Sequence, residues 1–251
     1  MSAIEAVYDI KILRRLAENE GSIAVSEYIN ESINRWKKEE VKFAIIGRSA
    51  TGKSTFLDTI RNLKPGDDGF AKAGFGNTTI TPTLHVFPKN DQIAFYDLPG
   101  YSFIKCKKTD YISEMKIFDY DFFFILFKNV PIEDEKWLVG ALRKLGKPFS
   151  LVRPKIDLDI ENAIHDGKDQ EMIIPEIKRG IKEALDANLE LKDTKAIFLI
   201  SCRKPELGEM SDLMRYVEDN IDGFKPQALL FSLCCITKEI WKEHTKCLRK
   251  D

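Results

Sequence analysis

The order of apolar and polar stretches along the chain predicts strands that alternate with helices. Continuous apolar runs, rather than alternating ones, are typical of strands buried on both faces of a sheet. Six segments have the length and composition of strands: 41–46, 83–87, 93–96, 122–127, 149–153 and 196–200. Pro88–Asp91 is a short polar turn between two of these segments, which predicts an antiparallel hairpin over 83–96.

Between these strands, apolar residues recur at steps of three and four, which is typical of helices with one buried face. The segments with this spacing are 55–60, 137–145, 174–185 and 213–221. Strands that alternate with helices form mostly parallel sheets covered on both faces. The sequence therefore predicts an α/β fold, with a mostly parallel six-stranded sheet, one antiparallel strand, helices on both faces and flanking helices at both ends.

Both ends of the chain have helical patterns outside this sheet. An apolar stripe from Val25 to Trp36 predicts one helix, and an earlier helix is expected before the break at Asn19–Ser22. This pair is either a cover for one end of the core or the start of a separate helical unit. A C-terminal helix is expected to pack on the pair or to lie on a membrane surface. The predicted divisions are an N-terminal helical segment, a central α/β domain and a C-terminal helical segment: 1–38, 39–224 and 225–251.

The segment Gly47–Ser54 (GRSATGKS) fits the pattern GxxxxGK[ST] of a phosphate-binding loop, and it lies between a predicted strand and a predicted helix. Its two glycines allow the backbone to curl so that successive N–H groups face phosphate oxygens, and the positive end of the following helix favours the anion. Lys53 is expected to bind the β- and γ-phosphates, and Ser54 to bind Mg²⁺. The nucleotide-binding residues expected here are Gly47, Ser49, Ala50, Thr51, Gly52, Lys53, Ser54 and Thr55.

A second motif, Asp97–Gly100 (DLPG), ends the second strand of the hairpin. Asp97 at this position can hold Mg²⁺ through a water, and the N–H of Gly100 can bind a γ-phosphate oxygen. A threonine of the preceding loop is expected to give its hydroxyl to Mg²⁺, and we favour Thr79, with Thr78 and Thr81 as alternatives. The expected Mg²⁺ ligands are therefore Ser54, Thr79 and Asp97. The expected catalytic residues are Lys53, Thr79 and Gly100.

Pro154–Asp157 (PKID) follows a predicted strand and is the candidate segment that reads the base. The Asp157 carboxylate can accept hydrogen bonds from N1–H and the exocyclic amine of guanine, whereas adenine offers neither donor in that geometry. The aliphatic stem of Lys155 can cover the face of the base. Ser201 and Cys202, which follow the last predicted strand, can present a backbone N–H to guanine O6. The sequence thus predicts GTP and GDP as ligands.

Composition narrows the class of protein without naming an activity. Of 251 residues, 43% are hydrophobic and 31% are charged, which is typical of a globular domain. The net charge is −1, with 39 basic and 40 acidic residues, so no nucleic-acid partner is expected. The five cysteines lack C-x-x-C spacing and are expected to be the reduced thiols of a cytoplasmic protein. The longest apolar run, Phe122–Phe127, is too short to cross a bilayer.

Several motifs in a fixed order resemble those of the immunity-related (interferon-inducible) GTPases over roughly residues 24–225. They are Tyr28–Trp36, Asp97–Gly100, Tyr111–Asp121, Val152–Asp159 and Phe198–Ser201. The resemblance implies a GTP-binding domain that forms homo-oligomers when loaded with GTP, contacts intracellular membranes as a peripheral protein, and hydrolyses GTP slowly until paired. Lys53 places the sequence with the GKS-type members of that family.

The sequence departs from the family pattern at several positions. Pro154 replaces the expected Thr or Asn of the base-reading motif. Asn77 stands where the family has a glutamate implicated in hydrolysis, and Tyr101 follows the DLPG motif in place of a glutamine that would position water. Family members also continue past the position of Asp251, so most of their C-terminal helical region is expected to be missing.

Three functions are compatible with these motifs. The first is a GTP-hydrolysing switch whose turnover depends on dimerisation. The second is a non-hydrolysing interaction module, in which bound GTP orders 77–81 and 100–108 into a binding face. The third is a P-loop ATPase, which Asp157 disfavours.

Overall fold

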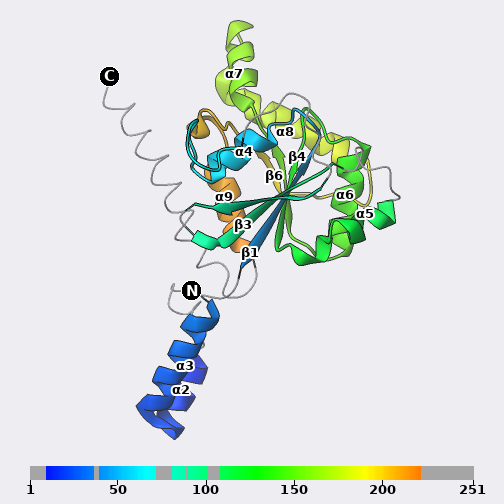
Figure 1. Cartoon of the computed structure of the whole chain (residues 1–251). Helices are drawn as coiled ribbons and strands as arrows, with labels where there is room; N and C mark the ends of the chain where they lie inside the picture. Colours follow the sequence, from blue (N-terminus) through cyan, green and yellow to red (C-terminus); the bar gives the residue numbers. More distant parts are fainter. Residues whose placement is uncertain (1–9, 37–39, 72–80, 89, 101–107, 222–251) are drawn as a thin grey trace.

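The described part of the protein forms a six-stranded sheet with helices on both faces, as predicted. The structure is a computed structural model that describes residues 10–36, 40–71, 81–88, 90–100 and 108–221. The strands are β1 (Val41–Gly47), β2 (Thr83–Phe87), β3 (Asn90–Leu98), β4 (Phe122–Leu126), β5 (Phe149–Arg153) and β6 (Ile197–Leu199). Their spatial order is β2-β3-β1-β4-β5-β6, and only the β2–β3 pair is antiparallel (Figure 1). This is the fold of a P-loop GTPase domain, and the predicted hairpin is confirmed.

The described helices include two that periodicity did not predict. Their bounds are α2 (Ile10–Asn19), α3 (Gly21–Trp36), α4 (Lys53–Ile60), α5 (Lys108–Glu114), α6 (Glu133–Lys144), α7 (Ile156–His165), α8 (Gln170–Asp186) and α9 (Met210–Asp219). Two 3₁₀ turns add η2 (Ile117–Asp119) and η3 (Pro205–Leu207). Of these helices, α5 and α7 are the ones that the sequence reasoning missed. Buried residues of α4 and α9 pack on one face of the sheet, and those of α6 and α8 pack on the other.

Aromatic packing fixes the helix that follows the phosphate loop against the sheet. Phe56 on α4 meets Phe124 on β4 edge to face, with ring centroids 5.1 Å apart. Phe43 on β1 stacks on Phe95 of β3 with centroids 5.0 Å apart. All four rings are buried, and such pairs contribute about 0.5–1.5 kcal/mol each beyond the area they bury. These aromatic contacts therefore hold the first turns of α4 against the sheet.

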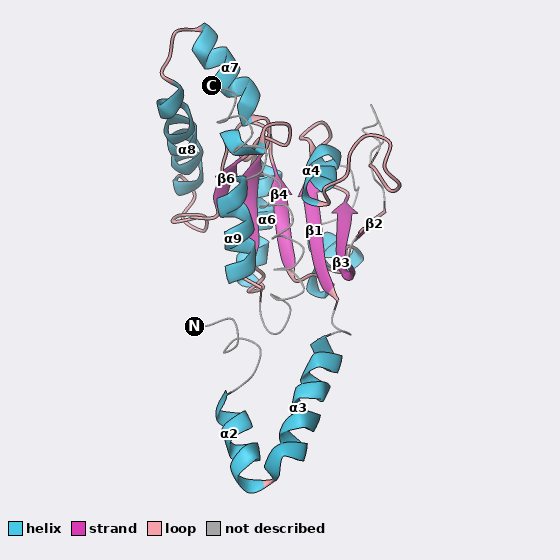
Figure 2. Ribbon diagram, turned by 90° about the vertical axis from the view of Figure 1, so that its left-hand side faces the viewer, coloured by secondary structure: helices cyan, strands magenta, loops and turns pink. Residues whose placement is uncertain are grey.

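The N-terminal helices α2 and α3 are joined at the predicted break, since α2 ends at Asn19 and α3 begins at Gly21. Figures 1 and 2 show them side by side as a hairpin that projects away from the sheet, beyond the amino-terminal end of β1. This placement favours a separate helical unit over a cover for the core. The division of the chain at 38 and 224 stays a prediction, and the predicted C-terminal helix lies outside the described residues.

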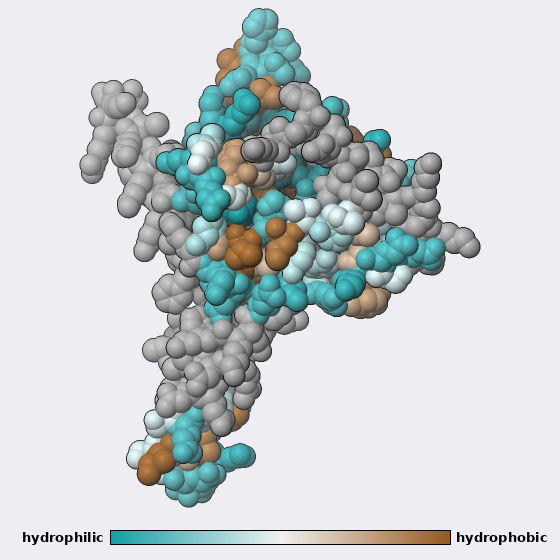
Figure 3. All heavy atoms as spheres, in the orientation of Figure 1, coloured by the Kyte–Doolittle hydropathy of each residue, from teal (hydrophilic) through white to brown (hydrophobic). Residues whose placement is uncertain are grey.

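The edge of the sheet formed by β2 has apolar side chains at its surface. Leu84 and Val86, two positions apart on this strand, are 50% and 42% exposed. Figure 3 shows a mostly hydrophilic surface with an apolar area on the side of the molecule where β2 lies in Figure 1. None of the described helices is both long and apolar enough to cross a membrane.

Replacing Ser150 by Ala is expected to stabilise the protein by about 1 kcal/mol. Ser150 on β5 is fully buried, and its hydroxyl has no hydrogen-bond partner within the described residues. The substitution removes a hydroxyl that loses its hydrogen bonds to water on folding and gains none from the part of the chain that the structure describes. Urea denaturation without nucleotide measures the effect.

The matched control for Ser150 is Ser201→Ala. Ser201 is equally buried, but its hydroxyl oxygen accepts hydrogen bonds from the backbone N–H groups of Arg203 and Lys204 at 3.2 and 2.9 Å. This variant is expected to lose about 1 kcal/mol of stability. A Ser150→Ala protein that unfolds at lower urea concentration than the wild type would contradict the prediction.

Candidate nucleotide site

The phosphate loop lies at the carboxyl end of β1, where α/β sheets bind their ligands. Ala50 and Gly52 have positive φ angles of 63° and 105°, and α4 begins directly after Gly52. The hydroxyl of Thr51 donates to the Arg48 carbonyl at 2.8 Å, which closes the turn. Successive residues that alternate between right- and left-handed conformations form a concave arrangement of backbone N–H groups that binds anions. The positive φ angles of Ala50 and Gly52 are compatible with such an arrangement.

Gly47 is needed at the start of the loop because the neighbouring strand is too close for a side chain. A Cβ at this position would lie 2.5 Å from the carbonyl oxygen of Leu126 on β4. Real Cβ atoms do not approach backbone oxygen this closely, so any other residue would push β1 and β4 apart. The glycine therefore sets how near the loop sits to the adjacent strand.

Lys53 begins α4 and points back across the loop that precedes it. Its Nζ donates to the carbonyl oxygen of Gly47 at 2.8 Å and lies 3.4 Å from that of Arg48. Burial lowers the pKa of this ammonium, and the nearby Asp97 carboxylate raises it in part. A phosphate oxygen beside Lys53 would offset the loss of hydration more strongly than a carbonyl does.

The residues predicted to hold Mg²⁺ are oxygen donors gathered near the same loop. Ser54 lies in the first turn of α4, and Asp97 on β3 pairs with Ile45 of β1, two residues before the phosphate loop. The effect of Asp97 on the Lys53 ammonium places this carboxylate beside the loop as well. Hydroxyl and carboxylate oxygens are the ligands that Mg²⁺ prefers, so the residues present fit this ion.

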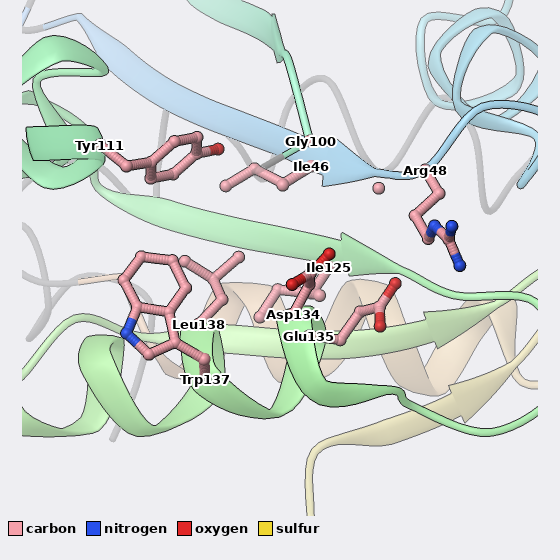
Figure 4. Close-up of a pocket in the computed structure, with 10 residues that line it drawn as sticks. Ile46, Arg48, Gly100, Tyr111, Ile125, Asp134, Glu135, Trp137 and Leu138 are labelled. Atoms are coloured by element: carbon pink, nitrogen blue, oxygen red, sulfur yellow. The ribbon is translucent and has the colours of Figure 1, made fainter. Parts of the chain in front are cut away.

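Some of the predicted site residues cannot be placed. Thr79, its alternative Thr78, and the departures Asn77 and Tyr101 lie outside the described residues. Thr81, the other alternative, is described and exposed. Gly100 is described and buried, and it lines a pocket together with Gly47 and Arg48 (Figure 4). The DLPG motif therefore does end beside the phosphate loop.

The base-reading segment is in direct contact with the phosphate loop. Lys155 Nζ donates to the carbonyl oxygen of Ala50 at 3.2 Å, although 105 positions separate the two residues. Pro154 lies against Gly52, since a Cβ at that glycine would be 3.6 Å from the Pro154 Cβ. Asp157 is in the first turn of α7 and is 5% exposed. The structure thus brings together two motifs that the sequence could only place at strand ends.

The segment after β6 is fixed to the helix of the phosphate loop. The Thr59 hydroxyl on α4 contacts the carbonyl oxygen of Cys202 at 3.3 Å, a bond that sequence reasoning missed. Burial raises the pKa of the Cys202 thiol to about 12, with Asp157 adding to the rise. The thiol is therefore protonated at neutral pH. Ser201 and Cys202 can contribute to a base site only through backbone groups and packing.

Sequence reasoning also gave no role to the residues beneath the phosphate loop. Glu135 near the start of α6 is buried, and its Oε2 accepts a hydrogen bond from the Ile132 N–H at 3.0 Å. Burial raises the pKa of this carboxyl, and the positive charge of Arg48 opposes that rise. Figure 4 shows Arg48 and Glu135 at one end of the pocket and Tyr111 at the other. No pattern in the sequence indicates that these residues line one pocket.

Comparison with known proteins assigns the family. The sequence model of the interferon-inducible GTPases (IIGP) matches residues 6–251, which is nearly the whole chain. This protein belongs to the interferon-inducible GTPase family. The resemblance carried by the motifs is thereby confirmed.

Relatives of this chain are known from the mouse. T-cell-specific guanine nucleotide triphosphate-binding protein 2 of Mus musculus is 31% identical over 203 residues, which cover 80% of this chain and 48% of that protein. Interferon-inducible GTPase 1 of Mus musculus is 26% identical over 247 residues, which cover 96% and 59%. The chain thus spans about half the length of the curated relatives it matches.

Similar solved structures include an elongation factor and NFeoB. The bacterial selenocysteine-specific elongation factor EF-Sec has a TM-score of 0.46 at 15% identity, over 72% of this chain and 28% of that one. NFeoB from S. thermophilus bound to GDP·AlF₄⁻ and K⁺ has a TM-score of 0.42 at 17% identity, over 72% and 60%. The fold assignment rests on the sheet order and the family model, not on these scores.

Proposed function

We propose that this chain is a guanine-nucleotide domain that binds GTP with Mg²⁺ and hydrolyses it to GDP and phosphate. The observation that carries the proposal is the contact of Lys155 with Ala50, together with the packing of Pro154 on Gly52. These contacts join a loop shaped for phosphates to a segment with a buried carboxylate for the base. A guanine nucleotide carries phosphates for the loop and a base for the carboxylate, so a single ligand can bind to both.

In the proposed reaction a water attacks the γ-phosphorus in line with the bond to the β–γ bridging oxygen, and that bond breaks. Charge spreads over the γ-phosphoryl oxygens as it is transferred. Lys53 and the N–H of Gly100 donate hydrogen bonds to these oxygens, and the phosphate-loop amides hold the β-phosphate. Ser54 and Asp97, together with Thr79, would hold Mg²⁺, which would supply further neutralising charge to the phosphates.

The proposal includes self-association in the GTP-loaded state. The sequence has Asn77 and Tyr101 at the two places where a side chain would orient the attacking water. A second copy of the chain can supply this missing group, which makes turnover depend on pairing. The proposed location is cytoplasmic, with peripheral contact to intracellular membranes, and liposome co-sedimentation with GTP or GDP would test that contact.

Phosphate release per protein molecule is expected to rise with protein concentration and then level off, because pairing completes the site. A coupled phosphate assay over a wide range of protein concentrations at saturating GTP and Mg²⁺ measures this. The same series with Lys53→Ala controls for contaminating phosphatase and should stay at background.

The competing proposal is a module that binds GTP without hydrolysing it. It is favoured by the same two departures, Asn77 and Tyr101. Tight GTP binding with near-zero release that stays flat across the concentration series would support this module and contradict hydrolysis. Equal affinity for ADP and GDP would contradict both proposals and indicate an ATPase.

A further inference from the structure

Tyr111 on α5 makes a buried hydrogen bond to the DLPG motif. Its side chain is fully buried, and its hydroxyl donates to the carbonyl oxygen of Pro99 at 2.8 Å. Its ring meets Trp137 of α6 edge to face, with centroids 5.9 Å apart. Figure 4 shows the Tyr111 hydroxyl directed toward Gly100 and Ile46, across the pocket from Trp137.

The accepting oxygen belongs to the same peptide group as the N–H of Gly100. The carbonyl carbon of Pro99 is bonded to the Gly100 nitrogen, and the peptide bond is planar and trans. In a trans peptide the C=O and N–H vectors point in opposite directions. A side chain that fixes the direction of the Pro99 carbonyl therefore also fixes the direction of the Gly100 N–H.

The side of the peptide opposite Tyr111 is the side of the phosphate loop. Gly100 shares a pocket with Gly47 and Arg48, and in Figure 4 Arg48 lies on the far side of Gly100 from Tyr111. With its carbonyl held by Tyr111 in the core, the Pro99–Gly100 peptide presents its N–H away from the core. A γ-phosphate is the acceptor expected there, and GDP has none.

We propose that Tyr111 is a positioning residue that orients the Gly100 amide toward the γ-phosphate. The inference rests on the proposed function. It means that the preference of the site for a nucleoside triphosphate over the diphosphate depends on one phenol hydroxyl in the core. A tyrosine that only filled space would be equivalent to phenylalanine.

Tyr111→Phe tests the inference because it keeps the ring and its contact with Trp137 and removes only the donor. Affinity for a non-hydrolysable GTP analogue with Mg²⁺ is expected to fall about three- to tenfold, the range of one hydrogen bond. Affinity for GDP is expected to stay within twofold, and kcat for hydrolysis to fall more than KM changes. Competition titration against fluorescent GDP gives both affinities.

Two control variants separate positioning from packing. Tyr120→Phe removes a phenol hydroxyl from the same apolar cluster, where Tyr120 contacts the rings of Tyr96 and Phe123 and its hydroxyl makes no hydrogen bond within the described part of the chain. It is expected to leave both affinities unchanged. Trp137→Phe loosens the packing around Tyr111 and is expected to lower Tm while the ratio of the two affinities stays that of the wild type.

The outcomes distinguish this inference from the proposed function. An unchanged ratio of GTP-analogue to GDP affinity in Tyr111→Phe overturns the inference, as does an equal loss for both nucleotides. A wild-type protein that binds neither nucleotide overturns the proposed function itself, and the inference with it. A selective loss of the analogue in Tyr111→Phe, absent from both controls, supports it.

Discussion

Lys53→Ala is expected to weaken binding of GTP about 100- to 1,000-fold, and binding of GDP, which lacks the γ-phosphate, about 10- to 100-fold. The ammonium of Lys53 lies against the phosphate loop, with its Nζ 2.8 Å from the Gly47 carbonyl oxygen. Hydrogen bonds from a charged donor contribute about 1.5–3 kcal/mol each, and this ammonium can donate to oxygens of two phosphates. Isothermal titration calorimetry with each nucleotide and Mg²⁺ measures the loss.

The burial of Lys53 is a further reason to expect a large loss of nucleotide affinity in Lys53→Ala. Because burial lowers the pKa of the ammonium, the bare loop holds the charged form at a cost that a phosphate would relieve. Lys144→Ala is the control, since Lys144 is an exposed lysine that pairs with Glu190 on the surface. It should leave both affinities unchanged. Near-wild-type affinity in Lys53→Ala would show that the loop does not bind phosphates through this side chain.

The sheet was predictable because its strands are continuous apolar runs. Phe122–Leu126 is buried at every position, as a central strand of a parallel sheet must be. The missed helices lack such a signal. Only Ile156 and Ile160 among the apolar residues of α7 are buried, whereas Leu158 and Ile164 are 46% and 52% exposed. The exposed Leu158 lies off the apolar face that Ile156, Ile160 and Ala163 form, which obscures the helical spacing, and α5 spans only seven residues.

The parts of the site that a motif defines through its local backbone could be predicted from the sequence. The parts that depend on contacts between distant segments could not. The second glycine of GxxxxGK[ST], Gly52, has the positive φ angle that glycine adopts without strain, whereas the positive φ of Ala50 has no signal in the motif. Pro154 replaces the Thr or Asn of the family's base-reading motif and has no polar side chain. The structure instead shows Pro154 packed on Gly52 and Lys155 bonded to the phosphate loop. No local pattern encodes these contacts, nor that of Tyr111, because their partners lie far away in sequence.

Asp157→Asn is expected to lower affinity for GDP about 100-fold or more and to create a preference for xanthine nucleotides. The Asp157 carboxylate is 5% exposed and offers two acceptor oxygens to the N1–H and amine donors of guanine. An asparagine offers one acceptor and one donor. Its NH₂ would face the exocyclic amine of guanine, and because both groups are donors, no hydrogen bond would form between them. Xanthine has a carbonyl at that position and keeps N1–H, so it matches the amide. Leaving buried polar groups unpaired in this way discriminates strongly between ligands.

Glu161→Gln is the matched control, because it makes the same change from carboxylate to amide on the same helix. Glu161 is exposed and pairs with Lys204 at 2.9 Å, so its loss should alter neither affinity nor base preference. Titration of GDP and xanthosine diphosphate into the wild type and both variants gives the full comparison. Equal loss of both nucleotides in Asp157→Asn would mean that this carboxylate supports the loop without reading the base. If the Asp157 carboxylate is hydrogen-bonded to the edge of the base, only Asp157→Asn should prefer xanthosine diphosphate over GDP. The reason is that only a contact at this edge distinguishes the amine of guanine from the carbonyl of xanthine.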